Sequence, residues 1–171
     1  MKYRNQQAVE EMLDTMKRRG PDQQNIYTDE AVTLLHARLS VMDLQHGKQP
    51  MQLKSDPRYV MVYNGELYNT EELRRELQKK GYAFQETSDT EVLLQAFIEW
   101  KETVVERLNG IFAFAVWDKK AHRLFMARDR MGVKPLFYTL QEGAMLFASE
   151  MKALLAHPQI PCLLYTSDAA D

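Results

Sequence analysis

The segment Arg58-Tyr-Val-Met-Val-Tyr-Asn-Gly-Glu66 carries the clearest structural signal in the chain. Its first six residues are rich in β-branched and aromatic side chains, a composition typical of a β-strand. The Asn64-Gly65 pair that follows is the commonest signal for a tight hairpin turn. The same pair could also serve as an oxyanion hole, because it offers a side-chain N–H beside a glycine backbone N–H. Both interpretations stay open at this point.

The segments around it combine helix and strand signals without a regular βαβ repeat. Apolar spacing of 3 and 4 predicts helices over residues 6–19, 69–80, 88–100 and 150–157. Strand composition marks residues 31–35, 111–118, 123–128, 135–140 and 144–148. Because the strands are grouped and the late ones form hairpins, we expect an α+β domain with antiparallel sheets packed on helices.

The composition is that of a single ordinary globular domain. The chain has 171 residues, of which 45% are apolar and 27% charged. A net charge of -2 argues against a nucleic-acid or anionic-membrane binder, since phosphate binding needs excess positive charge. The longest apolar run, Ile111 to Trp117, is too short to cross a bilayer, and acidic residues fill the place of a secretion signal. We therefore expect a cytoplasmic protein.

Four polar clusters are expected in loops at strand ends, at residues 18–22, 38–43, 64–66 and 88–91. Each has a structural explanation, such as a turn or a helix N-cap. Together these clusters supply the polar groups that a binding site for a free amino acid requires. An arginine can bind an α-carboxylate with two hydrogen bonds, and a carboxylate can bind an α-ammonium. The four histidines are scattered without the spacing of metal ligands, so no metal site is expected.

These clusters, in this order, resemble the class II glutamine amidotransferases, which have the N-terminal-nucleophile hydrolase fold. The sequence is most similar to the glutaminase domain of bacterial-type, glutamine-hydrolysing asparagine synthetases. The motifs that carry the resemblance are Arg19-Gly-Pro-Asp22, Arg38-Leu-Ser-Val-Met-Asp43, Asn64-Gly-Glu-Leu-Tyr-Asn69, Ser88-Asp-Thr-Glu91, Gly110-Ile-Phe-Ala-Phe114, Ala127-Arg-Asp129, Gly132-Val-Lys-Pro-Leu136 and Phe147-Ala-Ser-Glu150.

The resemblance implies a fold and a division of the chain. The fold is a four-layer αββα sandwich, here expected to lack its first strand. Residues 1–158 are expected to form the amidotransferase domain, incomplete at its N-terminus. Residues 159–171 form a tail that departs from the family around Cys162 and is expected to be disordered.

The resemblance also assigns roles to particular residues of this sequence. Arg38 would bind the α-carboxylate of L-glutamine, and Glu66 and Asp89 would bind its α-ammonium. The backbone that would line the same pocket belongs to Leu39, Ser40, Val41 and Met42. Asn64 and Gly65 would form the oxyanion hole.

The family nucleophile is an N-terminal cysteine, which this chain lacks. Cys162 is no substitute, because it has no paired α-amine and nothing near it in sequence to lower its pKa. The 171-residue chain is therefore expected to be inactive alone. In the family, ammonia passes to a synthetase domain that amidates aspartate. ATP and magnesium are expected in that domain and no cofactor in this one.

Two alternative functions remain from the sequence. The chain could be a class II amidotransferase that serves another acceptor. It could instead bind glutamine without hydrolysing it, as a regulatory module. A homodimer is possible on the resemblance, because synthetases of the family are often dimers.

Overall fold

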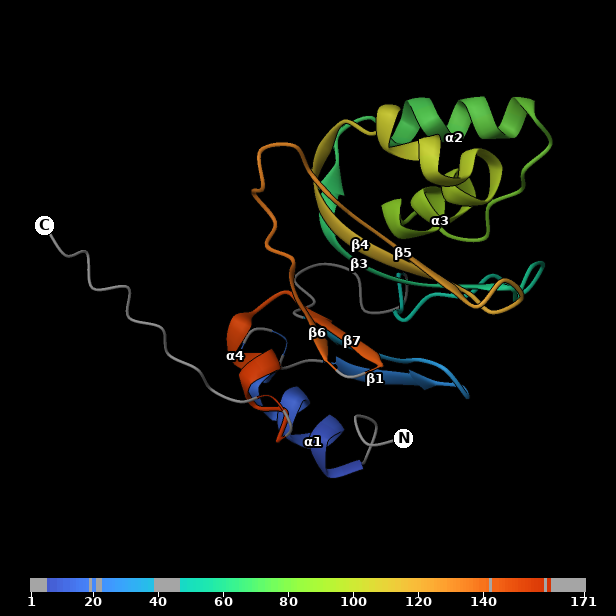
Figure 1. Ribbon diagram of the computed structural model, residues 1–171. Helices are drawn as coiled ribbons and strands as arrows, with labels where there is room; N and C mark the ends of the chain where they lie inside the picture. Colours follow the sequence, from blue (N-terminus) through green and yellow to red (C-terminus); the bar gives the residue numbers. More distant parts are fainter. Residues whose placement is uncertain are drawn as a thin grey trace, which may run out of the picture.

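The computed structural model describes residues 6–18, 20, 23–38, 47–141, 143–158 and 160 (Figure 1). Its helices are α1 (Gln6–Met16), α2 (Thr70–Lys79), α3 (Asp89–Trp100), the 3-10 helix η1 (Lys101–Glu106) and α4 (Met151–Leu155). Its strands are β1 (Gln23–Thr28), β2 (Thr33–Arg38), β3 (Tyr59–Leu67), β4 (Gly110–Asp118), β5 (Arg123–Arg128), β6 (Phe137–Gln141) and β7 (Ala144–Ala148).

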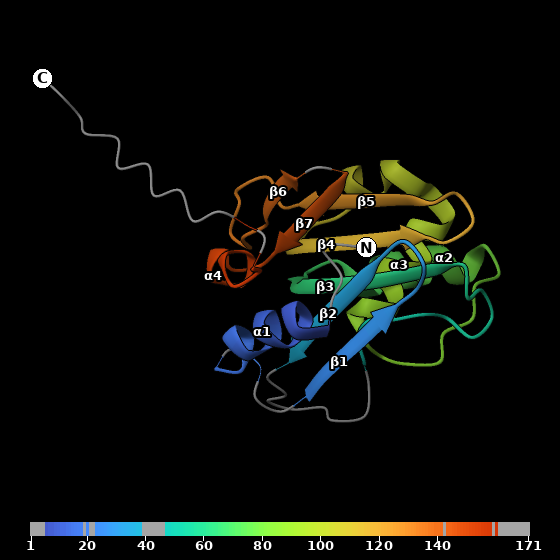
Figure 2. The ribbon, with the colours of Figure 1, turned by 60° about the horizontal axis from the view of Figure 1, so that its bottom comes forward.

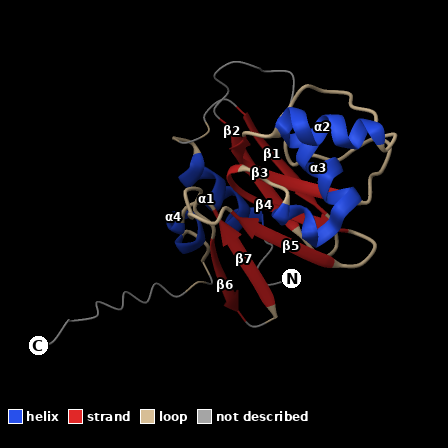
Figure 3. Ribbon diagram, turned by 90° about the horizontal axis from the view of Figure 1, so that it is seen from above, coloured by secondary structure: helices blue, strands red, loops and turns tan. Residues whose placement is uncertain are grey.

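The elements form four layers, helix–sheet–sheet–helix (Figures 1 and 3). Helices α2 and α3 cover one face of the sheet β3-β4-β5. The hairpins β1-β2 and β6-β7 lie together in a second layer on its other face, and α1 and α4 cover that layer from outside. The predicted αββα sandwich with antiparallel sheets is confirmed. The expectation about a first strand stays a prediction.

Strand β3 is the long element to which the other layers attach. It pairs antiparallel with β4 along its whole length, from Tyr59 opposite Asp118 to Leu67 opposite Gly110. Because side chains alternate between the faces of a strand, one face of β3 joins the core beneath α3 through Tyr59, Met61 and Tyr63. The other face joins a smaller core with Leu34 and Trp117 between the two sheet layers.

The secondary structure agrees with the sequence patterns except at two places. Strand β1 was not predicted, because its segment Gln-Gln-Asn-Ile-Tyr-Thr is polar and only every second residue is partly buried. Residues 64–66, expected in a loop, lie inside β3 and pair with residues 113–111 of β4. The hairpin interpretation of Asn64-Gly65 is therefore wrong. Position 65 is a glycine because β3 and β4 approach each other closely there.

Asp129 explains two of the motifs that carried the resemblance. Its carboxylate accepts backbone hydrogen bonds from Val133 (2.9 Å), Lys134 (2.9 Å) and Phe112 (3.2 Å). These bonds, the one from Lys134 first, hold the pKa of the Asp129 carboxyl below its usual range. The Ala-Arg-Asp and Gly-Val-Lys motifs thus fasten the chain after β5 to β4, a structural role.

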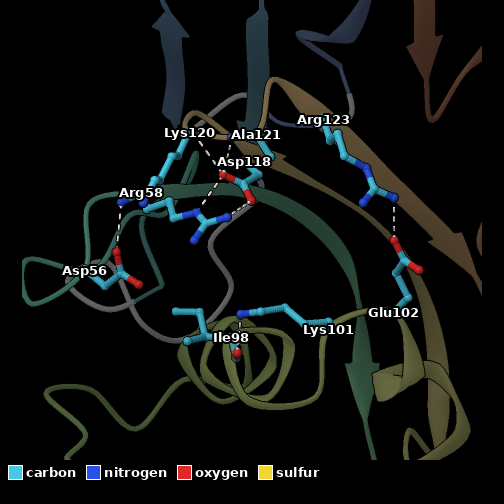
Figure 4. Close-up of polar contacts among 9 residues, drawn as sticks. All are labelled: Asp56, Arg58, Ile98, Lys101, Glu102, Asp118, Lys120, Ala121 and Arg123. Atoms are coloured by element: carbon cyan, nitrogen blue, oxygen red, sulfur yellow. Dashed lines mark hydrogen bonds and ion pairs between the residues drawn. The ribbon is translucent and has the colours of Figure 1, made fainter.

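An ion pair between Arg58 and Asp118 joins the start of β3 to the end of β4 (Figure 4). The Arg58 guanidinium donates to both carboxylate oxygens, at 2.7 and 2.5 Å. The backbone N–H groups of Lys120 and Ala121 donate to the same carboxylate at 3.0 Å. Chiefly through Arg58, these donors lower the pKa of Asp118 to about 2.

We predict that Asp118→Asn removes an acid-sensitive part of the stability. A carboxyl whose pKa is lower in the folded protein than the usual 3.8 stabilises the fold above pH 4 and ceases to do so as pH falls towards 2. After allowance for solvent screening at this partly exposed pair, the loss at pH 7 should be about 1–2 kcal/mol. Urea unfolding of both proteins at several pH values measures it. The difference should shrink by pH 2, and a difference independent of pH would contradict the assignment.

Candidate active site

The outer edge of β3 is held by side chains from two other parts of the chain. The backbone N–H of Tyr63 donates to Oε1 of Gln49 at 2.5 Å, and Met61 exchanges two backbone hydrogen bonds with Met51. The side chain of His36, on β2, hydrogen-bonds the backbone of Tyr63. This bond favours the protonated form of the imidazole, so His36 is the donor and the Tyr63 carbonyl is the acceptor. Residues 61 and 63 therefore direct their backbone polar groups away from β4.

The same alternation directs the backbone N–H of Gly65 towards this outer edge. Phe112, which lies opposite Gly65 on β4, supports this orientation. Its N–H and carbonyl bond Asp129, after β5, and so point away from β3. A side chain at position 65 would collide with the backbone, since a Cβ atom there would lie 2.3 Å from the carbonyl oxygen of Ile111. Glycine is thus required by close packing, and its N–H remains at an open edge.

Asn64, the residue before Gly65, carries a side-chain amide with no acceptor. Its Nδ2 atom is fully buried and has no hydrogen-bond partner among the described residues. A buried N–H₂ group without an acceptor is costly in a protein, and such groups are typical of functional sites. Asn64 also lines a cavity of about 790 Å³ between the two sheet layers. The pair therefore offers two donors to a ligand oxygen.

Asp89, the first residue of α3, lies near the same strand. Its carboxylate accepts a hydrogen bond from the Tyr63 hydroxyl at 2.8 Å. Burial, and then the negative charge of Asp89 and of Glu66, raises the pKa of the Tyr63 hydroxyl well above its usual value. The structure thus places Asp89 against Tyr63, the residue before Asn64 in β3.

Arg38 ends β2 and approaches the start of α3. A Cβ atom on Gly47 would lie 3.9 Å from Nη2 of Arg38, 3.5 Å from Cβ of Ser88 and 3.8 Å from Oγ1 of Thr90. Gly47 therefore sits between the guanidinium and the residues on either side of Asp89. The predicted Arg38 and Asp89 are brought to one region by the fold.

Gly20 of the Arg-Gly-Pro-Asp motif packs on the end of β2. A Cβ atom there would lie 2.3 Å from the carbonyl carbon of Ala37 and 2.4 Å from the nitrogen of Arg38. Only glycine allows this approach. The motif thus supports the strand end that carries Arg38.

The remaining predicted residues divide into two groups. Leu39, Ser40, Val41 and Met42 lie outside the described residues, so their place in the pocket stays a prediction. Ser88 and Glu91 have structural roles: Ser88 caps α3 through Glu91 N–H at 3.3 Å, and the buried Glu91 carboxylate accepts the N–H groups of Gln85 and Glu86.

Sequence reasoning missed Tyr63, Gln49, His36 and Gly47 as parts of the site. Tyr63 was seen only as a strand residue, and its partner Gln49 is 14 residues away in the chain. The one available signal was the position of Tyr63 directly before Asn64.

The sequence matches the family described as the glutamine amidotransferase domain over residues 1–167. The chain belongs to the glutamine amidotransferase family. It is 55% identical over 156 residues to glutamine-hydrolysing asparagine synthetase 3 of Bacillus subtilis, which covers 90% of this chain and 25% of that protein. It is 38% identical over 146 residues to asparagine synthetase B of Escherichia coli, which covers 85% of this chain and 26% of that protein.

A solved structure confirms the fold of this amidotransferase domain. Glutamine phosphoribosylpyrophosphate amidotransferase from B. subtilis superposes with a TM-score of 0.70 at 22% identity, over 88% of this chain and 40% of that chain. The resemblance predicted from the motifs is thereby confirmed. The chain spans about a quarter of the length of the curated asparagine synthetases it matches.

The described residues show neither a membrane-spanning helix nor a cluster of metal ligands. Within the described residues, no helix is long and apolar enough to span a bilayer. In the same part of the chain, His, Cys, Asp and Glu side chains form no group of three or more that could ligate a metal ion.

We predict that His36 of the amidotransferase domain makes its stability depend on pH between 6.5 and 4. Burial lowers the pKa of His36 to about 4, so the unfolded chain takes up a proton first as pH falls and the fold loses about 2–3 kcal/mol. His36→Gln retains a donor for the Tyr63 carbonyl but does not titrate. Urea unfolding from pH 7 to 4 should therefore give a flatter profile for the variant. Parallel profiles would show that His36 is not the source.

Proposed function

We propose that this domain hydrolyses the side-chain amide of L-glutamine to glutamate and ammonia. Arg38 binds the α-carboxylate, with the backbone of residues 39–42 along the pocket. Glu66 and Asp89 bind the α-ammonium. These assignments rest on the family motifs. The approach to Gly47 of Arg38 and of Ser88 and Thr90, the neighbours of Asp89 in sequence, supports them.

One observation carries the proposal. The buried Nδ2 of Asn64 has no acceptor in the described structure, and the next residue, Gly65, directs its N–H to the edge of β3 away from β4. An amide carbonyl attacked by a nucleophile develops a negative charge on its oxygen, and two fixed donors stabilise that charge. Removal of one such donor costs about 10²–10³ in kcat. A strand interior would otherwise favour an apolar residue at position 64.

These proposed roles separate the residues that bind glutamine from those that act on its side-chain amide. The charged groups at Arg38, Glu66 and Asp89 recognise the two ends of an α-amino acid and are needed before any bond changes. Asn64 and Gly65 act on the oxygen of the side-chain amide and matter chiefly in the transition state. The nucleophile of the family is an N-terminal cysteine thiolate whose own α-amine is the base. The only cysteine in the 171 residues is Cys162, outside the described residues.

The use of the ammonia is a further part of the proposal. Glutamine-hydrolysing asparagine synthetases match this chain at 38–55% identity over more than four fifths of its length. On that ground we propose that the ammonia serves ATP-dependent amidation of aspartate by a synthetase domain, in the cytoplasm. ATP and magnesium would act in that domain and have no role in the chemistry assigned to these residues.

We predict that the 171-residue chain binds L-glutamine and that Arg38→Lys weakens the binding at least tenfold. Lysine keeps the charge but loses the two parallel hydrogen bonds to a carboxylate, which are together worth about 1.5–3 kcal/mol. Titration calorimetry with L-glutamine measures the affinity, and D-glutamine tests recognition of the α-carbon.

Two variants serve as controls for this titration. Arg75→Lys makes the same change on the exposed side of α2 and should leave the affinity unchanged. Asn64→Ala should change it less than about threefold, because the oxyanion hole acts in the transition state. Equal affinities of wild type and Arg38→Lys would overturn the role of Arg38.

We also predict that the 171-residue chain alone releases no glutamate from millimolar glutamine. Cys162 has no adjacent α-amine to activate its thiol. A coupled glutamate assay measures the release. Sustained release that disappears in Asn64→Ala would show that the chain itself supplies a nucleophile. Saturable binding without release fits the proposal for this chain, whereas neither binding nor release would contradict the site.

A further inference from the structure

The side chain of Tyr63 connects the long sheet with the first turn of α3. Tyr63 lies in β3 and is buried in the core beneath α3, with only 4% of the residue exposed. Helix α3 packs on the face of β3 that is turned away from the β1-β2 hairpin, and Figure 2 shows β3 between the two. The Tyr63 hydroxyl reaches Asp89, the first residue of α3, and donates to its Oδ2 atom at 2.8 Å.

This hydroxyl is the only hydrogen-bond partner of the Asp89 side chain within the described residues. Asp89 is only partly buried, so without the bond its carboxylate could rotate between staggered positions. Burial, and then the negative charge of Asp89 and of Glu66, raises the pKa of the Tyr63 hydroxyl, which therefore keeps its proton and stays a donor at neutral pH. The bond fixes Oδ2 of Asp89 and leaves Oδ1 without a hydrogen-bond partner in the same part of the chain.

The backbone that carries Asp89 is fixed by other contacts. Ser88 caps α3 by accepting the N–H of Glu91 at 3.3 Å. The buried Glu91 carboxylate in turn accepts the N–H of Glu86 at 2.6 Å, which fastens the segment before the helix. Rotation of the Asp89 side chain is therefore the main freedom left at this position, and the Tyr63 hydroxyl restricts it.

The ring of Tyr63 also lies against the backbone of Gly65. A Cβ atom on Gly65 would lie 2.7 Å from Cε2 of Tyr63, so only a residue without a side chain leaves room for the ring. Residues 63 and 65 share one face of β3, because side chains alternate along a strand. One rigid ring thus contacts a residue of the proposed oxyanion hole, and its hydroxyl bonds the residue proposed to bind the α-ammonium.

We propose that Tyr63 is a positioning residue for the glutamine site. Its hydroxyl holds Asp89 so that the unpaired oxygen, Oδ1, receives the α-ammonium of the bound amino acid. This inference rests on the proposed function, because the orientation of Asp89 matters to binding only if Asp89 binds the α-ammonium. A purely structural role, in which the bond merely joins β3 to α3, makes a different prediction for ligands that lack the ammonium group.

The test compares two ligands on the 171-residue chain and on Tyr63→Phe, which loses the hydroxyl and keeps the ring. The ligands are L-glutamine and glutaric acid monoamide, which is glutamine without its α-amino group. Ligand-observed NMR titration measures both affinities, including weak ones. We expect Tyr63→Phe to weaken L-glutamine about tenfold, the loss expected for one hydrogen bond to a charged group. Binding of glutaric acid monoamide should change less than about twofold, because it has no ammonium for Asp89 to bind.

Tyr82→Phe is the matched control. The Tyr82 hydroxyl also donates to a carboxylate, that of Glu99, at 2.9 Å, and Glu99 lies close to the other end of α3 from Asp89. Loss of this second tyrosine–carboxylate bond should leave the affinity for L-glutamine unchanged.

Asp89→Glu keeps the proposal testable if Tyr63→Phe fails to fold. It retains the negative charge in the first turn of α3, where an acid is favourable, but moves the carboxylate by one methylene relative to the Tyr63 hydroxyl. We expect about tenfold weaker binding of L-glutamine and unchanged binding of glutaric acid monoamide. Wild-type affinity for L-glutamine in Asp89→Glu would overturn the proposal.

The other results separate the positioning role from the proposed function. Unchanged binding of L-glutamine by Tyr63→Phe would overturn the positioning role alone. Tighter binding would also overturn it, since the hydroxyl would then compete with the α-ammonium for the carboxylate. Equal losses for both ligands would show that the bond only maintains the fold. If the wild-type chain binds neither ligand, the proposed function itself fails, and the positioning role fails with it.

Discussion

The backbone and side chain of Tyr63 fix the geometry on which the site depends. The N–H bonds Gln49, the carbonyl bonds His36, and the hydroxyl bonds Asp89 at the start of α3. One residue of β3 thus connects the edge segment, the second sheet layer and the helix layer. Because Asn64 and Gly65 follow directly, their donors are held in place by contacts from three directions. Hydrogen-bond donors that are held in this way need little adjustment when negative charge develops on a ligand oxygen.

Most of the fold could be predicted because its signals are local. Helical spacing identifies α2 and α3, and β-branched and aromatic runs identify β3 and β4, since each of these elements has one strongly apolar face. Strand β1 was missed because it is stabilised by neighbours and has a polar sequence. Ser88 caps α3, whereas Asn69 precedes α2 without capping it, because its side chain bonds Arg107 and Asn109 instead.

The candidate site was predicted less completely, for a different physical reason. The motifs predict which chain positions form the site, but Asn64-Gly65 is also compatible with a turn. What distinguishes the strand is tertiary: β4 approaches so closely that only glycine fits at position 65, and Gln49 occupies the adjacent edge. Neither contact can be predicted from the residues around Asn64 and Gly65. Tyr63 was overlooked for the same reason, since its three partners are far from it in the chain.

The placement of Arg38 depends on a layer whose two hairpins, β1-β2 and β6-β7, do not pair with each other within the described residues. A two-stranded hairpin is barely stable by itself, so β1-β2 keeps its position through contacts with the long sheet. These include the Trp117 indole bonding Asp29 at 2.6 Å and Asn25 bonding the Gln49 carbonyl at 2.9 Å. Arg38 lies at the end of β2 and Asn64 on β3, so any shift of this hairpin changes the distance between the residue proposed to bind the carboxylate and the proposed oxyanion hole.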